Sequence, residues 1–302
     1  MNLAYLLTTN LLIRTVFDLN IALLQQHLSQ HLQQLVRERD PFLGQAGHYF
    51  VREYIRQELA NFGEVETHSS KWQGKTYENL ILNIGRRAGG KKAAPILIGA
   101  HYDTVPGSPG ADDNATGIAV LLELARYFSQ TAAKYPIRLV AFDLEEYGWG
   151  GSLPYATLLR ERGEKLRLML SLESLGYCSD TPGSQTYPAK FLEFIYPSQG
   201  NFIALIGNLE AAGDMLSISR KMKEKVPCQW LPVPLKGKIL PDMRRSDHAP
   251  FWDLGYRAMM VTDTADARNP NYHTAKDTIK TLDLDFLANV YQGLVRVIET
   301  LS

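Results

Sequence analysis

Short apolar runs alternate with longer amphipathic segments from residue 95 to the C-terminal end. Each apolar run has the length of a buried strand, and each intervening segment carries apolar residues at helical spacing. The predicted strands are Ile96–Ala100, Ile137–Phe142, Leu168–Leu172, Phe202–Gly207 and Arg257–Val261, and the predicted helices are Thr116–Phe128, Leu153–Arg162, Ala211–Lys223 and Asp283–Leu301. This alternation predicts an α/β protein, a three-layer α/β/α sandwich whose mostly parallel mixed sheet has helices on both faces.

The N-terminal region has a different pattern. Residues 19–59 favour two helices interrupted near Pro41–Gly44, and Glu64–Ser69 and Asn79–Ile84 are typical of strands joined by a turn at Gly74. We therefore interpret residues 1–302 as a single domain on which the helical segment 1–60 packs. Histidines 27 and 31 are four residues apart on the first helix, and we interpret them as part of its polar face, since no acidic base lies between them.

Two segments, 177–200 and 226–245, break the alternation and are rich in proline and other loop-favouring residues. Long irregular segments in compact domains are usually functional loops. We expect both segments to be insertions over the functional site. The basic loop Arg86–Lys92 is interpreted as a solvated turn.

Charge and composition exclude some classes of function. The formal net charge is +0, and no stripe of Lys and Arg interleaves with aromatic residues, so we expect no nucleic-acid partner. No apolar run reaches the roughly 20 residues of a membrane-spanning helix, so we expect no membrane partner either. Polar residues interrupt the apolar stretch Met1–Leu24, which disfavours a signal peptide without removing a secreted or periplasmic location. Cys178 and Cys228 are interpreted as free thiols, and a cytoplasmic location is favoured. The oligomeric state is left open.

Residues able to bind a metal ion follow several of the predicted strands. These candidate ligands are His101, Glu145, Glu146 and Glu173, with His273 downstream of the last strand and Asp113 in the loop after the first. Open α/β sheets bind ligands at the carboxyl ends of their strands, so we expect these side chains to converge. Taken alone, Asp113 is better explained by helix capping, and an isolated Glu-Glu pair usually lies on the surface.

Charge supports a pair of divalent cations. Two neutral histidines with the carboxylates of Asp113, Glu146 and Glu173 leave about one positive charge on such a pair, which one bridging hydroxide neutralises. Asp103 stands where a carboxylate would orient the imidazole of His101. Mixed imidazole and carboxylate donors favour zinc, with cobalt and manganese as alternatives.

Six segments carry a resemblance to a known family. They read H-Y-D-T, G-A-D-D-N-A-T-G, L-E-E-Y-G-W-G-G-S, S-L-E-S-L-G-Y, R-S-D-H-A-P-F and Y-H-T-A-K-D-T, in that order from His101 to Thr278. Together they resemble the co-catalytic zinc aminopeptidases, the metallopeptidase family of bacterial leucyl aminopeptidases and glutamate carboxypeptidase II. The resemblance implies a zinc-peptidase-like fold and hydrolysis of the peptide bond next to a free N-terminus.

The resemblance also implies roles for individual residues. His101 and Glu173 with bridging Asp113 would hold one zinc, and Glu146 and His273 with the same Asp113 would hold the other. Glu145 would be the general base toward a metal-bridging hydroxide, with Asp103 orienting His101. Tyr272 and Arg245 would stabilise the tetrahedral oxyanion, although Arg245 is equally well explained by loop packing or a surface salt bridge. A cis peptide bond is expected between Asp113 and Asn114.

Three points stay open. Many family members have Asp at the position of Glu173, so one zinc per chain is the alternative to two. The same scaffold supports carboxypeptidase, aminoacylase and glutaminyl cyclase chemistry, and the cyclase predicts one tightly held zinc. A non-catalytic binding protein would be expected to lose ligands or the base, and none is missing here.

Overall fold

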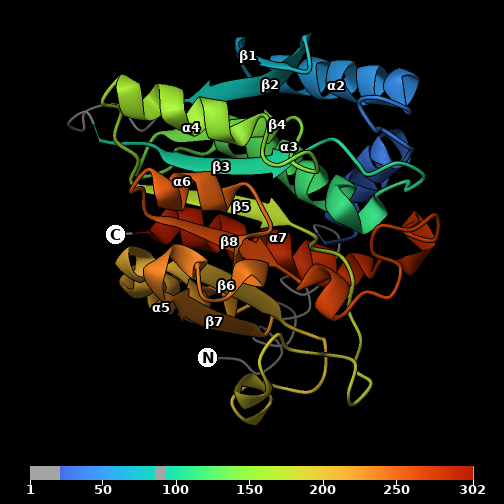
Figure 1. Ribbon diagram of the computed structural model, residues 1–302, viewed down its shortest axis with the longest axis vertical. Coiled ribbons are helices and arrows are strands. Elements are labelled where there is room, and N and C mark those ends of the chain that lie inside the picture. The colour runs from blue at the N-terminus through green and yellow to red at the C-terminus, as the bar shows by residue number, and fades with distance from the viewer. Residues whose placement is uncertain (1–20, 86–92, 302) are drawn as a thin grey trace, which may run out of the picture.

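The computed structural model describes residues 21–85 and 93–301, and an eight-stranded sheet forms its centre. The strands are β1 (Val65–Trp72), β2 (Lys75–Ile84), β3 (Ile96–His101), β4 (Ile137–Phe142), β5 (Leu168–Glu173), β6 (Ile203–Asn208), β7 (Cys228–Val233) and β8 (Ala258–Thr262). Their order across the sheet is β1-β2-β4-β3-β5-β8-β6-β7 (Figure 1). The central strands β4, β3, β5 and β8 are mutually parallel, whereas β1, β2 and β6 make antiparallel pairs. The predicted mixed sheet is confirmed.

Helices pack on both faces of this sheet. The helices are α2 (Gln45–Ala60), α3 (Gly117–Gln130), α4 (Ser152–Glu161), α5 (Ala212–Met222), α6 (His248–Asp253) and α7 (Leu284–Thr300), and residues 21–35 are also helical. Alternate residues of β3 enter different cores: Ile98 packs with α3 and α7, whereas Leu97 packs with α4 and α6. The three-layer α/β/α arrangement follows from this alternation, because successive side chains of a strand point to opposite faces.

The N-terminal region forms the two predicted helices. Residues 21–35 and α2 are separated at Pro41–Gly44, where the interruption was expected. Histidines 27 and 31 lie on the helix face turned toward α3, and both contact the buried carboxylate of Glu123. Within the described ranges, no group of donors that could hold a metal ion includes either histidine. The first residues of the apolar stretch Met1–Leu24 and the loop Arg86–Lys92 lie outside the described residues.

One of the two predicted irregular segments contains a strand. Residues 177–200 are irregular apart from the short helix η2 (Lys190–Phe194), as expected. In contrast, the prediction for 226–245 is wrong over β7, which pairs with β6 at the edge of the sheet. Pro232 is tolerated in β7 because an edge strand has one side without ladder hydrogen bonds. Because proline is typical of loops, the sequence around β7 was interpreted as irregular.

Two further predictions concern the cysteines and the absence of a membrane-spanning helix. Cys178 and Cys228 are free thiols, as predicted. Over residues 21–85 and 93–301, the structure contains no helix with the length and apolar character needed to cross a membrane.

Candidate metal centre

Five predicted ligands from separate segments meet at the carboxyl ends of the central strands. His101 ends β3 and Glu173 ends β5, while Glu146 follows β4. Asp113 lies in the turn before α3, and His273 lies in the loop after β8. Two groups of three donors result, His101–Asp113–Glu173 and Asp113–Glu146–His273, with ligand atoms within 4.8 Å of one another in each group.

Asp113 belongs to both groups because its two oxygens face different histidines. Oδ1 lies 3.1 Å from Nε2 of His101, and Oδ2 lies 2.9 Å from Nε2 of His273. Asp112 faces away and instead accepts hydrogen bonds from the Gly176 amide and from Asn269. The peptide bond between Asp113 and Asn114 is cis, as expected. A carboxylate arranged in this way can bridge two cations.

Several buried polar atoms at this point have no hydrogen-bond partner. They are both oxygens of Asp113, Oε1 of Glu146 and Nε2 of His101 and of His273. Buried polar atoms almost always have a hydrogen-bond partner, so a convergent set of nitrogen and oxygen atoms without one requires an explanation. Divalent cations coordinated by these atoms would supply it, and the imidazole and carboxylate donors fit zinc.

The protonation behaviour of the site reflects its crowded carboxylates. Burial and repulsion from Asp113 raise the pKa of Glu146 to about 7, although His273 opposes this. Burial lowers the pKa of His273, but the adjacent carboxylates of Asp113 and Glu146 outweigh it and raise this pKa to about 10. Protons on the histidines therefore balance the carboxylates when no cation is present.

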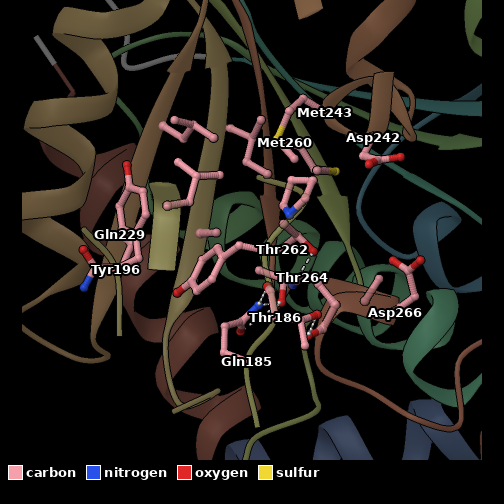
Figure 2. Close-up of a pocket in the computed structure, with 18 of the residues that line it drawn as sticks. Gln185, Thr186, Tyr196, Gln229, Asp242, Met243, Met260, Thr262, Thr264 and Asp266 are labelled. Carbon is pink, nitrogen blue, oxygen red and sulfur yellow. Dashed lines mark hydrogen bonds between the residues drawn. The ribbon is translucent and has the colours of Figure 1, made fainter. Parts of the chain in front are cut away.

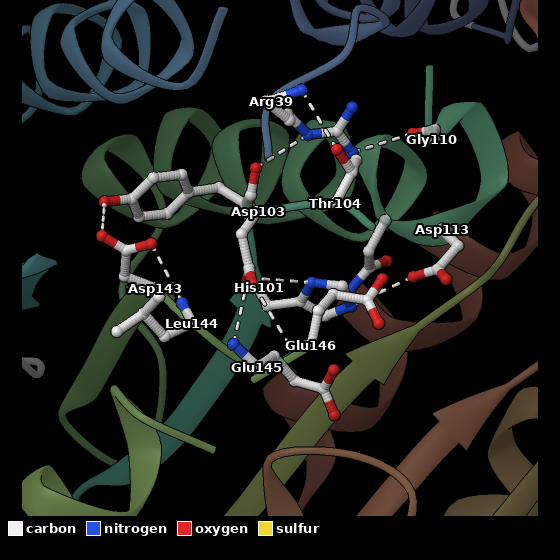
Figure 3. Close-up of polar contacts among 12 residues, drawn as sticks. Arg39, His101, Asp103, Thr104, Gly110, Asp113, Asp143, Leu144, Glu145 and Glu146 are labelled. Atoms are coloured by element: carbon white, nitrogen blue, oxygen red, sulfur yellow. Dashed lines mark hydrogen bonds and ion pairs between the residues drawn. The ribbon is translucent and has the colours of Figure 1, made fainter. Parts of the chain in front are cut away.

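Glu145 and Asp103 lie beside the ligands (Figure 3). The carboxylate of Glu145 comes within 4.8 Å of donor atoms of His101 and Glu146. Burial and neighbouring carboxylates raise the pKa of Glu145, which His101 only partly opposes. Asp103 lies 3.4 Å from Nδ1 of His101 and accepts the backbone N–H groups of Glu145 and Glu146 at 3.1 and 3.2 Å. One carboxylate thus contacts both the ligand from β3 and the loop after β4.

Left-handed backbone conformations cluster at the site. Leu144, which precedes Glu145, has φ 55°, and Ser174, which follows Glu173, has φ 48°. The ligand His273 itself has φ 58°. Each such non-glycine residue costs on the order of 1 kcal/mol or more and persists only where the surroundings enforce it. The ligand-bearing loops are therefore held in unfavourable conformations by their contacts.

Some positioning residues were missed in the sequence. The carboxylate of Asp277 accepts the backbone N–H groups of Asp112 and Asp113 at 3.0 and 3.2 Å. Ser246 donates a hydrogen bond to Oε2 of Glu173 at 2.8 Å. Both residues lie within the family-like segments quoted above, which is the only signal that singled them out. Their partners are far away in the sequence.

Tyr272 and Arg245 lie next to the centre. The ring of Tyr272 stacks on that of His273 with centroids 3.8 Å apart. Arg245 donates to the Tyr272 hydroxyl at 3.3 Å and to Asp266 at 2.8 Å. The sequence-based alternative for Arg245, a surface salt bridge, describes its contact with Asp266, while its contact with Tyr272 brings it to the site.

A cavity of about 290 Å³ opens beside these residues (Figure 2). Glu173, Arg245 and Tyr272 form its edge toward the metal-binding residues. Much of its interior is apolar, with Leu192, Phe202, Ile206, Leu231, Met243 and Met260 in its wall. Residues 185–196 and 229–245 contribute to this wall, so both segments predicted as insertions border the site.

The sequence has relatives among known proteins. It is 32% identical over 261 residues to the uncharacterized protein YfbL of Escherichia coli (strain K12), covering 82% of this chain and 78% of that protein. It is 28% identical over 217 residues to aminopeptidase YwaD of Bacillus subtilis (strain 168), covering 70% of this chain. The match spans 42% of the length of YwaD.

Solved structures share the fold. LapB from Legionella pneumophila superposes with a TM-score of 0.68 at 21% identity, covering 92% of this chain and 71% of that one. A glutaminyl cyclase from Bacteroides thetaiotaomicron superposes with a TM-score of 0.67 at 18% identity, covering 92% and 97%. The profile of peptidase family M28 matches residues 79–203 and 232–298, more than half of the chain. This protein belongs to peptidase family M28.

Proposed function

We propose that this protein is a zinc-dependent aminopeptidase that hydrolyses the N-terminal peptide bond of peptides. The observation that carries the proposal is the pair of three-donor groups sharing Asp113, with Glu145 alongside. His101, Asp113 and Glu173 would hold one zinc, and Asp113, Glu146 and His273 the other. The substrate partner is a peptide with a free N-terminus.

The chemistry divides between the cations and the side chains. When bound, a zinc pair would polarise the scissile carbonyl and lower the pKa of water. Glu145 accepts a proton from the attacking water and returns it to the leaving amine, a role suited to a carboxyl whose pKa is raised. Asp103 holds the His101 ring and the backbone at Glu145. The Tyr272 hydroxyl, contacted by Arg245, donates to the oxyanion of the tetrahedral intermediate.

The cavity would take the side chain of the N-terminal residue. It lies against Glu173 and Tyr272, so a substrate at the centre would direct one side chain into it. Its apolar wall favours leucine-like or aromatic side chains, because each buried methylene contributes about 0.8 kcal/mol.

Glutaminyl cyclase chemistry is the second candidate, favoured by the fold shared with the Bacteroides cyclase. A cyclase with one tightly held zinc would need only one donor group. The two donor groups, each with three ligands, support the hydrolase instead.

A substrate panel tests the proposal. Leucyl-, phenylalanyl- and alanyl-arylamides, an N-acetyl-leucyl-arylamide, an N-acyl amino acid and a peptide with N-terminal glutamine are each incubated with zinc-loaded and chelated protein. We expect zinc-dependent release of arylamine only from substrates with a free amino group. Cyclisation of the glutamine peptide without arylamide hydrolysis would refute the proposal, as would hydrolysis that survives removal of the metal.

A further inference from the structure

Arg39 connects the N-terminal region to the loop between His101 and Asp113. Its side chain is buried, with 1% of its surface exposed. The guanidinium donates to the backbone oxygens of Tyr102 at 2.7 Å, Pro109 at 2.7 Å and Gly110 at 2.8 Å. Figure 3 shows Arg39 above this loop. One planar group therefore contacts the loop directly after His101 and again just before the turn of Asp113.

The contact at Gly110 extends to the turn itself. The Gly110 oxygen that accepts from Arg39 also accepts the backbone N–H of Ala115 at 3.1 Å, across Asp113. Gly110 has φ 61°. A Cβ at this position would come within 2.4 Å of the backbone carbonyl oxygen of Asp113 and within 2.9 Å of the Arg39 guanidinium. The loop thus packs directly against Arg39 at this point, with no room for a side chain between them.

The next residue contacts the other ligand-bearing loop. Asp40 is fully buried, and its carboxylate accepts the backbone N–H of Phe42 at 2.8 Å. It also accepts a hydrogen bond from the hydroxyl of Tyr147, which directly follows Glu145 and Glu146. Residues 39 and 40 therefore contact the loop after β3 and the loop after β4 together.

Charge is consistent with this arrangement. Burial lowers the pKa of Arg39 to about 10, while the carboxylates of Asp113, Asp277, Asp103 and Glu146 oppose this fall. The guanidinium therefore remains charged at neutral pH and offsets part of the negative charge that collects at the centre.

We propose that Arg39 is a positioning residue that presets the His101–Asp113 loop for zinc binding, with Asp40 holding the Glu145–Glu146 loop through Tyr147. The proposal rests on the metal centre proposed above. Both residues lie outside the residues matched by the family profile, which begin at residue 79. Lysine at position 39 keeps the charge but lacks the planar group that contacts Tyr102, Pro109 and Gly110 together.

The test compares Arg39→Lys and Tyr147→Phe with wild type and with Arg37→Lys as the matched control. The Arg37 side chain lies over the ring of Phe50 rather than on the loop. Hydrogen exchange is measured in metal-free protein, and zinc affinity is measured with zinc alone against a competing chelator. We expect Arg39→Lys to accelerate exchange in residues 101–117 without changing it in β6 and β7, and to weaken zinc binding about 10- to 100-fold. Tyr147→Phe should weaken zinc binding about threefold to tenfold.

The outcomes separate this proposal from the proposed function. The proposal for Arg39 would be overturned if Arg39→Lys had the hydrogen exchange and the zinc affinity of wild type. Faster exchange spread evenly over the whole sheet would also overturn it, because that result indicates a general loss of stability. If Arg39→Lys does not fold, unchanged zinc affinity in Tyr147→Phe overturns the proposal and weakened affinity supports it. If wild-type protein binds no zinc, the proposed function fails, while exchange in the metal-free variants still decides whether Arg39 holds the loop.

Discussion

Zinc binding to this protein should release protons, and its affinity should rise with pH. Nε2 of His273 lies 2.9 Å from Asp113 and 3.2 Å from Glu146. An imidazolium there pairs with both carboxylates, and Asp113 has a second imidazole partner in His101, whose Nε2 lies 3.1 Å away. Zinc needs the neutral imidazole, so the cation must displace that proton.

The size of the effect follows from the two pKa values. With the pKa of His273 raised to about 10, removing its proton at pH 7 costs about 4 kcal/mol. Because the folded, metal-free histidine is protonated below this pKa, apparent affinity should increase about tenfold per pH unit from pH 7.5 to 9. Glu146, whose pKa is raised to about 7, also binds a proton below pH 7. Zinc affinity should therefore fall more steeply with decreasing pH in that range.

Calorimetry in pairs of buffers with different ionisation enthalpies counts the released protons. We expect about one proton per zinc at pH 8, and fewer in His273→Gln. The half-buried His68, whose pKa is lowered by burial and by Arg162, is a matched control: His68→Gln should release as many protons as wild type. Affinity that stays flat between pH 7.5 and 9, with a binding enthalpy independent of the buffer, would refute the reasoning.

Three further predictions concern the base, the cavity and the core. Glu145→Gln should lower kcat for a leucyl-arylamide by about 10²- to 10⁴-fold while zinc stays bound after dialysis, and turnover near wild type would exclude Glu145 as the base. Ala204→Phe places a larger side chain in the cavity wall and reduces the cavity volume. The ratio of kcat/KM for leucyl to alanyl substrates should then fall about tenfold, and an unchanged ratio would place the substrate side chain elsewhere. Burial raises the pKa of Glu123, but His31 and Arg126 outweigh it and lower this pKa to about 2. Glu123→Gln should therefore cost about 1.5 to 3 kcal/mol of unfolding free energy above pH 4.5, a difference that disappears as the pH falls toward 2 and that denaturant titration would measure.

The strands and the convergence of the candidate ligands at their ends could be predicted because both signals are local. Each central strand is formed by a mainly apolar run, and His101 and Glu173 follow such runs directly, so the topology of an α/β sheet brings them together. β7 was missed because Pro232 and the prolines that flank the strand are typical of loops, and the place of β7 at the sheet edge permits Pro232. The six-residue α6 is too short to show a helical period.

The contacts that position the ligands could not be predicted in the same way. Asp112 and Asp113 are adjacent and chemically identical, and the backbone turn decides which of them faces the histidines. Asp277 contacts that turn from a distant loop. No local pattern encodes a side chain whose partners are backbone groups far away in the sequence, because any of many carboxylates could make the same contact.

The role proposed for Arg39 extends the functional unit beyond the region matched by the family profile. The backbone oxygens of Tyr102, Pro109 and Gly110 accept hydrogen bonds from one buried guanidinium in the N-terminal region. Without this guanidinium the Tyr102 and Pro109 oxygens lose a buried donor, at about 1 to 3 kcal/mol for each one left unsatisfied, whereas the Gly110 oxygen keeps the Ala115 N–H. A loop next to strained ligands would move in response to a cost of that size. In this proposal, residues 21–64 belong to the metal centre by their hydrogen bonds, although none of them is among its ligands.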